Sequence, residues 1–84
     1  MYASSRNWGL EYMVYQLTEF GRYDAKPTAY QNIQSWKKVK TLLAREGAVS
    51  KERLIDACAD HDHDAGPAGF IRYILRNEWI EEVR

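Results

Sequence analysis

Four amphipathic segments, separated by short stretches that end one helix and start the next, limit most strongly what this chain can fold into. In each segment apolar residues recur at the i, i+3, i+4 spacing of one helix face. The clearest boundary is Gly47 followed by Ser50, because glycine often ends a helix and serine caps the next one. The sequence therefore predicts a mainly α-helical fold of three to four helices, with at most a minimal two-stranded β element.

The first two helices are expected over residues 7–20 and from Thr28 to Gly47. Gly21 stands where a glycine would end the first helix, and Thr28 with Gln31 forms a capping box at the start of the second. An apolar stripe at helical spacing is expected to form the buried face of the second helix: Ile33, Trp36, Val39, Leu42 and Leu43.

The other two helices are expected after Ser50 and over residues 66–77, where Pro67 suits the first turn. Asn77 is expected to end the last helix in a left-handed conformation. The tail around Ile80 is predicted to be either a short strand or a last helical turn. Both helices carry residues that are predicted to be buried: Leu54, Ile55, Cys58, Phe70, Ile71, Ile74 and Leu75.

The chain has 84 residues, which we interpret as one domain over residues 1–84. Its 12 basic and 12 acidic side chains cancel, which excludes a polycation that coats nucleic acid and an acidic DNA mimic. No apolar run approaches the roughly 20 residues that a membrane span requires. A single cysteine suits a reducing compartment, so we expect a cytoplasmic protein with no membrane partner.

Residues 30–83 resemble a winged helix-turn-helix domain. Residues 35–43 look like its first helix, and residues 47–54 look like its glycine, short strand, capping serine and second helix. Residues 70–81 look like its third helix running into the first wing strand. The resemblance implies a winged-helix-like unit over residues 28–84, with residues 7–20 as an accessory helix. Two departures are the longer turn at 61–66 and the lack of a second wing strand after residue 83.

The resemblance implies a small DNA-binding or transcription-regulating protein, whose helix 66–77 enters the major groove of double-stranded DNA. Arg72 and Arg76 lie four residues apart, off the apolar stripe, and arginine suits bidentate contact with guanine. The small size suggests a phage or mobile-element origin. The residues expected at the DNA are Gly69, Arg72, Tyr73 and Arg76 on the helix, with Lys37, Lys38, Lys40 and Lys51 at phosphates.

A competing interpretation is that the two arginines only solvate the surface and pair with Glu52, Asp56 or Glu78. Acidic residues before the helix, at positions 60, 62 and 64, would also repel DNA. A homodimer would double the favourable contacts.

A second function class is suggested by aromatic residues in excess of what a small core can bury. Trp8, Tyr12, Tyr15 and Tyr23 are the candidate interface residues, since tyrosine and tryptophan are favoured at protein interfaces. The alternative function is therefore an adaptor or inhibitor that docks on a host protein, as phage-encoded inhibitors of host systems do.

Metal binding and catalysis have little support in the sequence. Cys58, His61 and His63 are weak zinc candidates, because their spacing matches no standard module and Cys58 lies on an apolar face. A buried cysteine beside a solvated loop is the simpler interpretation, so no cofactor is expected. No catalytic motif is present, and Ser50 already serves as a helix cap. We expect neither an enzyme nor a small-molecule substrate.

Overall fold

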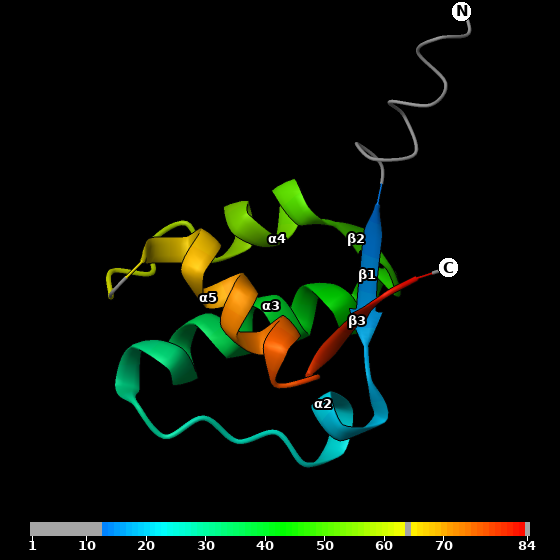
Figure 1. Ribbon diagram of the computed structural model, residues 1–84, viewed down its shortest axis with the longest axis horizontal. Coiled ribbons are helices and arrows are strands. Elements are labelled where there is room, and N and C mark those ends of the chain that lie inside the picture. Colours follow the sequence, from blue (N-terminus) through cyan, green and yellow to red (C-terminus); the bar gives the residue numbers. More distant parts are fainter. Residues whose placement is uncertain (1–12, 64, 84) are drawn as a thin grey trace, which may run out of the picture.

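The computed structural model describes residues 13–63 and 65–83, which form four helices and three short strands (Figure 1). The described helices confirm the expectation of a mainly α-helical fold, and none of them is long and apolar enough to cross a membrane. In chain order the elements are β1 (Val14–Leu17), α2 (Glu19–Tyr23), α3 (Tyr30–Glu46), β2 (Val49–Ser50), α4 (Lys51–Ala57), α5 (Gly66–Arg76) and β3 (Ile80–Glu82).

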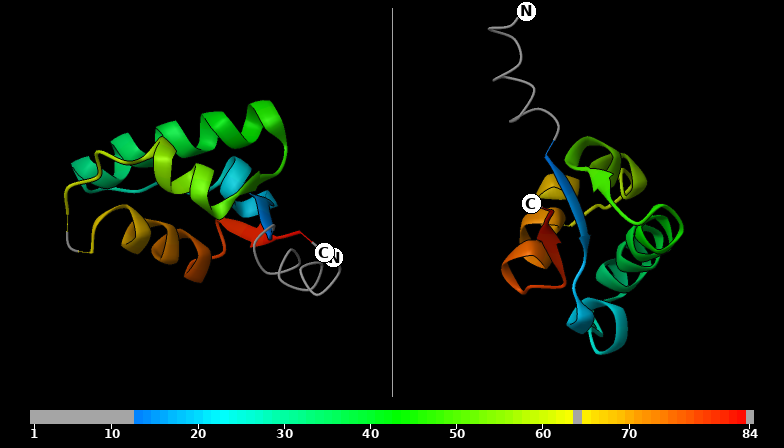
Figure 2. Two further views of the ribbon diagram at one scale, coloured as in Figure 1. Left: turned by 90° about the horizontal axis from the view of Figure 1, so that it is seen from above. Right: turned by 90° about the vertical axis from the view of Figure 1, so that its right-hand side faces the viewer.

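The three strands form one antiparallel sheet in the order β2–β1–β3, which lies at one end of the helices (Figure 2). Tyr15 pairs with Val49 on one side and with Glu82 on the other. The expectation of at most two strands is wrong, because the sequence analysis did not anticipate the central strand. Strand β1 comes before α3 in the chain, so β3 pairs with a strand that lies N-terminal to helices α3, α4 and α5.

The segment predicted as a helix over residues 7–20 is a strand followed by a short helix wherever the structure describes it. Along β1 the side chains alternate between half-buried and buried, with Tyr15 and Leu17 in the core. Val14 and Leu17 also fit a helical stripe, but pairing of β1 with two strands satisfies its backbone and decides the outcome. Thr18 then begins α2, because its Oγ1 accepts a hydrogen bond from the Gly21 N–H.

Helix α2 packs against the turn that joins α5 to β3. Gly21 is buried inside α2 instead of ending a helix, and a Cβ at this position would overlap the Trp79 carbonyl oxygen. The backbone N–H of Thr18 donates a hydrogen bond to the Trp79 carbonyl oxygen at 3.1 Å. The Thr18 hydroxyl donates a second hydrogen bond to the Glu78 carbonyl. The glycine is therefore required for close packing.

Three predicted boundary signals are confirmed in the second half of the chain. Gly47 ends α3 with a φ of 84°, and its N–H donates to the Leu43 carbonyl. Ser50 caps α4 by accepting a hydrogen bond from the Arg53 N–H. Pro67 lies in the first turn of α5, where its missing N–H costs nothing.

Two other boundary predictions are wrong. Helix α3 begins at Tyr30 after Ala29, without a side-chain cap, so the Thr28–Gln31 capping box does not form. Asn77 has a φ of −85°, and the left-handed conformation is adopted by Glu78, one residue later, with a φ of 63°. The Asn77 side chain instead donates to the Tyr73 carbonyl.

The core lies between α3, α4, α5 and the sheet. The rings of Trp36 and Trp79 pack at a centroid distance of 5.0 Å. Ile33 and Leu75 were expected in the core, but 41% and 36% of their surfaces are exposed. Ile33 faces a groove beside the loop before α3, and Leu75 lines a hollow next to α2. The buried apolar residues are Tyr15, Leu17, Ala25, Trp36, Val39, Leu42, Leu43, Val49, Leu54, Cys58, Phe70, Ile71, Ile74, Trp79 and Ile80.

Candidate nucleic-acid interface

Helix α5 presents an exposed face that carries the four helix residues predicted to contact DNA. The opposite side of α5 is buried through Phe70, Ile71 and Ile74. This burial fixes the rotation of the helix, so Arg72 and Arg76 are exposed, one turn apart. We call Gly69, Arg72, Tyr73 and Arg76 the α5 face.

The α5 face borders a shallow hollow of about 300 Å³. Gly69 lies close to Ala65, and a Cβ on Gly69 would overlap the Ala65 side chain. Internal packing thus explains this glycine without a ligand. The hollow also includes residues that the sequence analysis did not place near α5. Its lining is Asn32, His61, His63, Ala65, Gly69, Phe70, Arg72, Tyr73 and Arg76.

Neither arginine of the α5 face forms an ion pair with any residue that the structure describes. The ion pairs found there join Lys38 to Asp60, and Glu46 to both Arg45 and Arg53. The competing interpretation placed Arg72 and Arg76 in pairs with Glu52, Asp56 or Glu78, and none of these pairs is formed within the described residues. Both arginine residues are exposed on the surface of α5.

Tyr73 lies between the two arginines and is partly exposed. Its ring makes an edge-on contact with the Trp79 ring at 5.5 Å and lies 6.2 Å from the Phe70 ring. These contacts hold the ring against the core while about a third of the residue remains exposed. Tyr73 therefore offers a rigid edge beside the arginine side chains.

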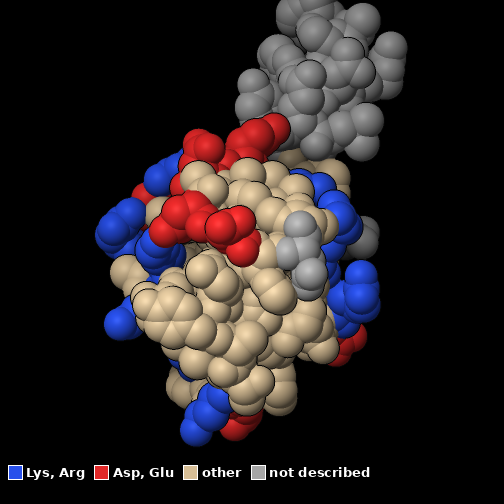
Figure 3. All heavy atoms as spheres, turned by 90° about the vertical axis from the view of Figure 1, so that its left-hand side faces the viewer, with Lys and Arg blue, Asp and Glu red and all other residues tan. Residues whose placement is uncertain are grey.

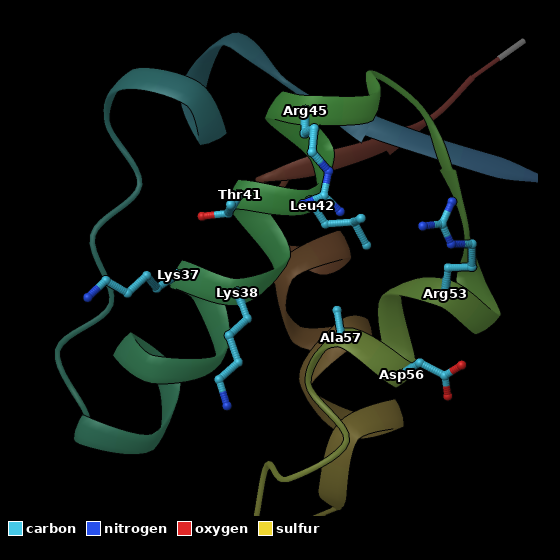
Figure 4. A pocket seen from close by; sticks show the side chains of 8 residues that line it. All are labelled: Lys37, Lys38, Thr41, Leu42, Arg45, Arg53, Asp56 and Ala57. Carbon is cyan, nitrogen blue, oxygen red and sulfur yellow. The ribbon is translucent and has the colours of Figure 1, made fainter.

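The four lysines predicted to hold phosphates lie elsewhere. Lys37 and Lys38 line a groove between α3 and α4, and in Figure 4 Lys37 projects from α3 away from α4, whereas Lys38 projects downward from α3. Lys37 also borders a second groove, beside α2, together with Lys40. Lys51 begins α4. The structure does not bring these lysines into the hollow beside the α5 face.

The groove between α3 and α4 has a volume of about 610 Å³, and its lining holds four basic residues and one acidic residue. Arg53 donates two hydrogen bonds to the Glu46 carboxylate, at 2.5 and 2.8 Å. Arg45 lies 3.5 Å from the same carboxylate. Hydrogen bonding to Arg53 holds the pKa of Glu46 below its ordinary value. These contacts join α3 to α4 and pair two of the four basic lining residues with one carboxylate.

Asp60 and Asp62 precede α5 in the chain. Figure 3 shows acidic side chains between two groups of basic side chains at one end of the molecule. Asp60 pairs with Lys38 at 2.5 Å, and this hydrogen bond holds the pKa of Asp60 below its ordinary value. Asp62 is exposed, and its backbone N–H donates to the Gln31 side chain. Asp64 lies outside the described residues. The repulsion expected from Asp60 is thus partly compensated.

The weak metal candidates have other roles in the structure. Cys58 is fully buried, its thiol donates to the Leu54 carbonyl, and burial raises its pKa to about 11. His61 is 6% exposed, and its ring packs 4.8 Å from the Phe70 ring, so the expectation of a fully solvated loop is wrong here. Within residues 13–63 and 65–83, no three cysteine, histidine or acidic side chains are arranged to hold a metal ion.

His61 reaches the core because Ser35 provides a hydrogen-bonding partner. The His61 Nδ1 lies 2.7 Å from the Ser35 Oγ, and both groups are buried. Sequence analysis missed this pair. The available signal is that Ser35 lies four residues before Val39, and seven before Leu42, on an otherwise apolar stripe. A polar residue there requires a buried partner.

Two of the candidate protein-interface residues lie among the described residues. Tyr15 is only 7% exposed, because it faces the core from β1. Tyr23 is 69% exposed at the end of α2. Trp8 and Tyr12 lie outside the described residues. No family model, curated protein or solved structure matches this chain.

Proposed function

We propose that this chain is a winged-helix-like DNA-binding protein that reads the major groove with the α5 face. The observation that carries the proposal is the exposure of Arg72 and Arg76, one turn apart, without an ion pair among the described residues. The major groove admits one α-helix, and arginine pairs bidentately with guanine. Tyr73 lies between the two arginines in the sequence, and the edge of its ring provides a contact surface for a base or a sugar of the DNA.

The order of the elements supports the winged-helix part of the proposal. From α3 onward the chain runs helix, strand, helix, helix, strand, which is the order that the resemblance implies. The resemblance also requires a second wing strand beside β3. In this proposal β1 takes that place, since it pairs antiparallel with β3 and also with β2. The position is thus filled by a segment that precedes α3.

The positions of the lysines narrow the proposal to a small contact area. If Arg72 and Arg76 are the only side chains that displace counterions from the DNA, the logarithm of the affinity should fall with the logarithm of salt at a slope of about −2 per protomer. Contacts by all four lysines as well would give a slope of about −5. A homodimer would double the smaller value. The salt slope therefore distinguishes the α5 face from a wider basic surface.

The test is the fluorescence anisotropy of a labelled random-sequence DNA duplex, titrated with the full chain at several salt concentrations from about 50 mM upward. We expect binding at low salt with a shallow slope, and loss of binding in the Arg72→Ala/Arg76→Ala double variant. The matched control is Lys37→Ala/Lys38→Ala, which removes the same charge from another groove. Equal loss in both variants, or no binding by the wild type at low salt, would contradict the proposal.

A protein-binding function is the second candidate, and one observation favours it. Three large apolar side chains near the start of α3 are exposed: Tyr23 by 69%, Tyr30 by 71% and Ile33 by 41%. This surface differs from the one predicted, since Tyr15 is buried and Ile33 was expected in the core.

A further inference from the structure

A groove between α2, the following loop and α3 exposes Tyr23 and Ile33, two apolar side chains that lie outside the core. Its volume is about 450 Å³, and it lies apart from the α5 face. Tyr30 stands one turn before Ile33 on α3 and extends the apolar surface beyond the groove. Contiguous exposed apolar surface often marks an interaction site. The apolar residues of this α2–α3 groove are Tyr23, Ala25, Pro27, Ile33 and Trp36.

Trp36 provides a rigid aromatic element in this groove. It is 5% exposed, and its ring is held against the Trp79 ring on the core side. Its Nε1–H is buried and has no hydrogen-bond acceptor within the part of the chain that the structure describes. Tryptophan and tyrosine are the residues that most often dominate binding energy at interfaces. The groove therefore offers an anchoring position next to Ile33.

The charged residues that line the groove are all basic: Lys26, Lys37 and Lys40. None of them takes part in an ion pair with a described residue, in contrast to Lys38. Asp24 is exposed on the adjoining turn but does not line the groove. An apolar surface with an unpaired basic rim is complementary to a segment that carries carboxylates around a large apolar side chain.

We propose that the α2–α3 groove binds an acidic peptide segment of a partner protein, with one large apolar side chain seated between Tyr23 and Ile33. Ala25, Pro27 and Ile33 give the groove an aliphatic wall beside Tyr23 and Trp36, and this wall suits a leucine or a phenylalanine. The three lysines pair with carboxylates on either side of that anchor. This surface is independent of the α5 face, so its function does not depend on DNA binding.

The test uses the full chain as bait for a displayed library of random 12-residue peptides. We expect the recovered peptides to be enriched in aspartate or glutamate around one large apolar residue. The peptide recovered most often is then synthesised with a fluorescent label, and its affinity is measured by anisotropy. Substituting alanine for its apolar anchor, or raising the salt concentration, should weaken binding.

Variants of the full chain locate the site. Tyr23→Ala and Ile33→Ala, both at exposed positions, should each weaken binding of the labelled peptide about tenfold or more. The matched control is Phe20→Ala, which removes an exposed aromatic residue of α2 that lines a different hollow. It should bind the peptide as the wild type does. Circular dichroism of each variant confirms that it is folded.

Charge reversal tests the basic rim separately. Lys37→Glu/Lys40→Glu should abolish binding of the acidic peptide, whereas Lys51→Glu, outside the groove, should not change it. Arg72→Ala/Arg76→Ala should also leave it unchanged, which separates this proposal from DNA binding. The proposal is overturned if the library yields no acidic peptides, if single-stranded DNA competes for the groove, or if Ile33→Ala instead disrupts a dimer of this chain.

Discussion

The Nδ1 atom of His61 lies 2.7 Å from the Oγ atom of Ser35, and this buried contact ties the loop before α5 to the middle of α3. The loop also packs on α5, since the His61 ring contacts the Phe70 ring. A single polar pair thus helps to fix where α5 begins relative to α3.

Replacing Ser35 by alanine should destabilise the fold by leaving a buried imidazole nitrogen without this partner. We expect Ser35→Ala to lower the free energy of unfolding by about 1–3 kcal/mol. Thr41→Ala, at an exposed position of the same helix, should change it by less than about 0.5 kcal/mol. Urea denaturation followed by circular dichroism measures both. Equal stability of the two variants would show that the contact contributes nothing.

Gly21 should tolerate no side chain, because a Cβ would meet the Trp79 carbonyl group. We expect Gly21→Ala to cost about 1–3 kcal/mol in unfolding free energy, as overpacked positions do. The neighbouring Arg22 is exposed, so Arg22→Ala should stay within about 0.5 kcal/mol of the wild type. Thermal unfolding of the pair provides the comparison. An unchanged midpoint for Gly21→Ala would contradict the packing of α2 described above.

Burial of Cys58 should make the fold sensitive to alkaline pH. The folded thiol has a pKa of about 11, above its ordinary value of 9.0, so the folded state holds its proton while the unfolded chain loses it. This contribution to stability is complete below pH 9 and is lost as the pH rises through about 11. Thermal midpoints of the wild type should therefore fall more steeply over this window than those of Cys58→Ala. If the thermal midpoints of the wild type and Cys58→Ala fall equally with pH, the Cys58 thiol is not buried in the folded state.

The Glu46–Arg53 contact should have the opposite pH dependence. The pKa of Glu46 is lowered from 4.5 in the folded state, so its contribution is present above that pH and is lost as the pH falls below it. Glu46→Gln and Arg53→Gln should each flatten the acid limb of the stability curve, and the double variant should flatten it no further. Acid titrations followed by circular dichroism would reveal any additivity, which would mean that the two groups act separately.

Local signals were sufficient to predict α3, α4 and α5. Gly47 and Ser50 mark a boundary through their own backbone preferences, and Pro67 does the same for α5. These effects depend on a few neighbouring residues, so the sequence shows them directly. The burial of Phe70 and Ile74 likewise follows from spacing along one helix, and it places Arg72 on the surface.

The parts that could not be predicted depend on residues far apart in the chain. Val14–Leu17 fits a helical stripe, and only its pairing with residues 49–50 and 80–82 makes it a strand. The spacing along α3 shows that Lys37 and Lys38 lie off its apolar stripe. It does not show which other segments of the chain lie beside them. The burial of His61 depends on Ser35 in the same way, because the two residues lie 26 positions apart.

The place of β1 at the centre of the sheet also orders the events of folding. Its strand partners come from the middle of the chain and from the last described strand, so the backbone of β1 can pair with both only after β3 has been synthesised. Such distant pairing carries a high entropic cost and slows folding. Helices α3 to α5 can assemble early through contacts between consecutive elements, whereas the sheet closes only when β3 arrives.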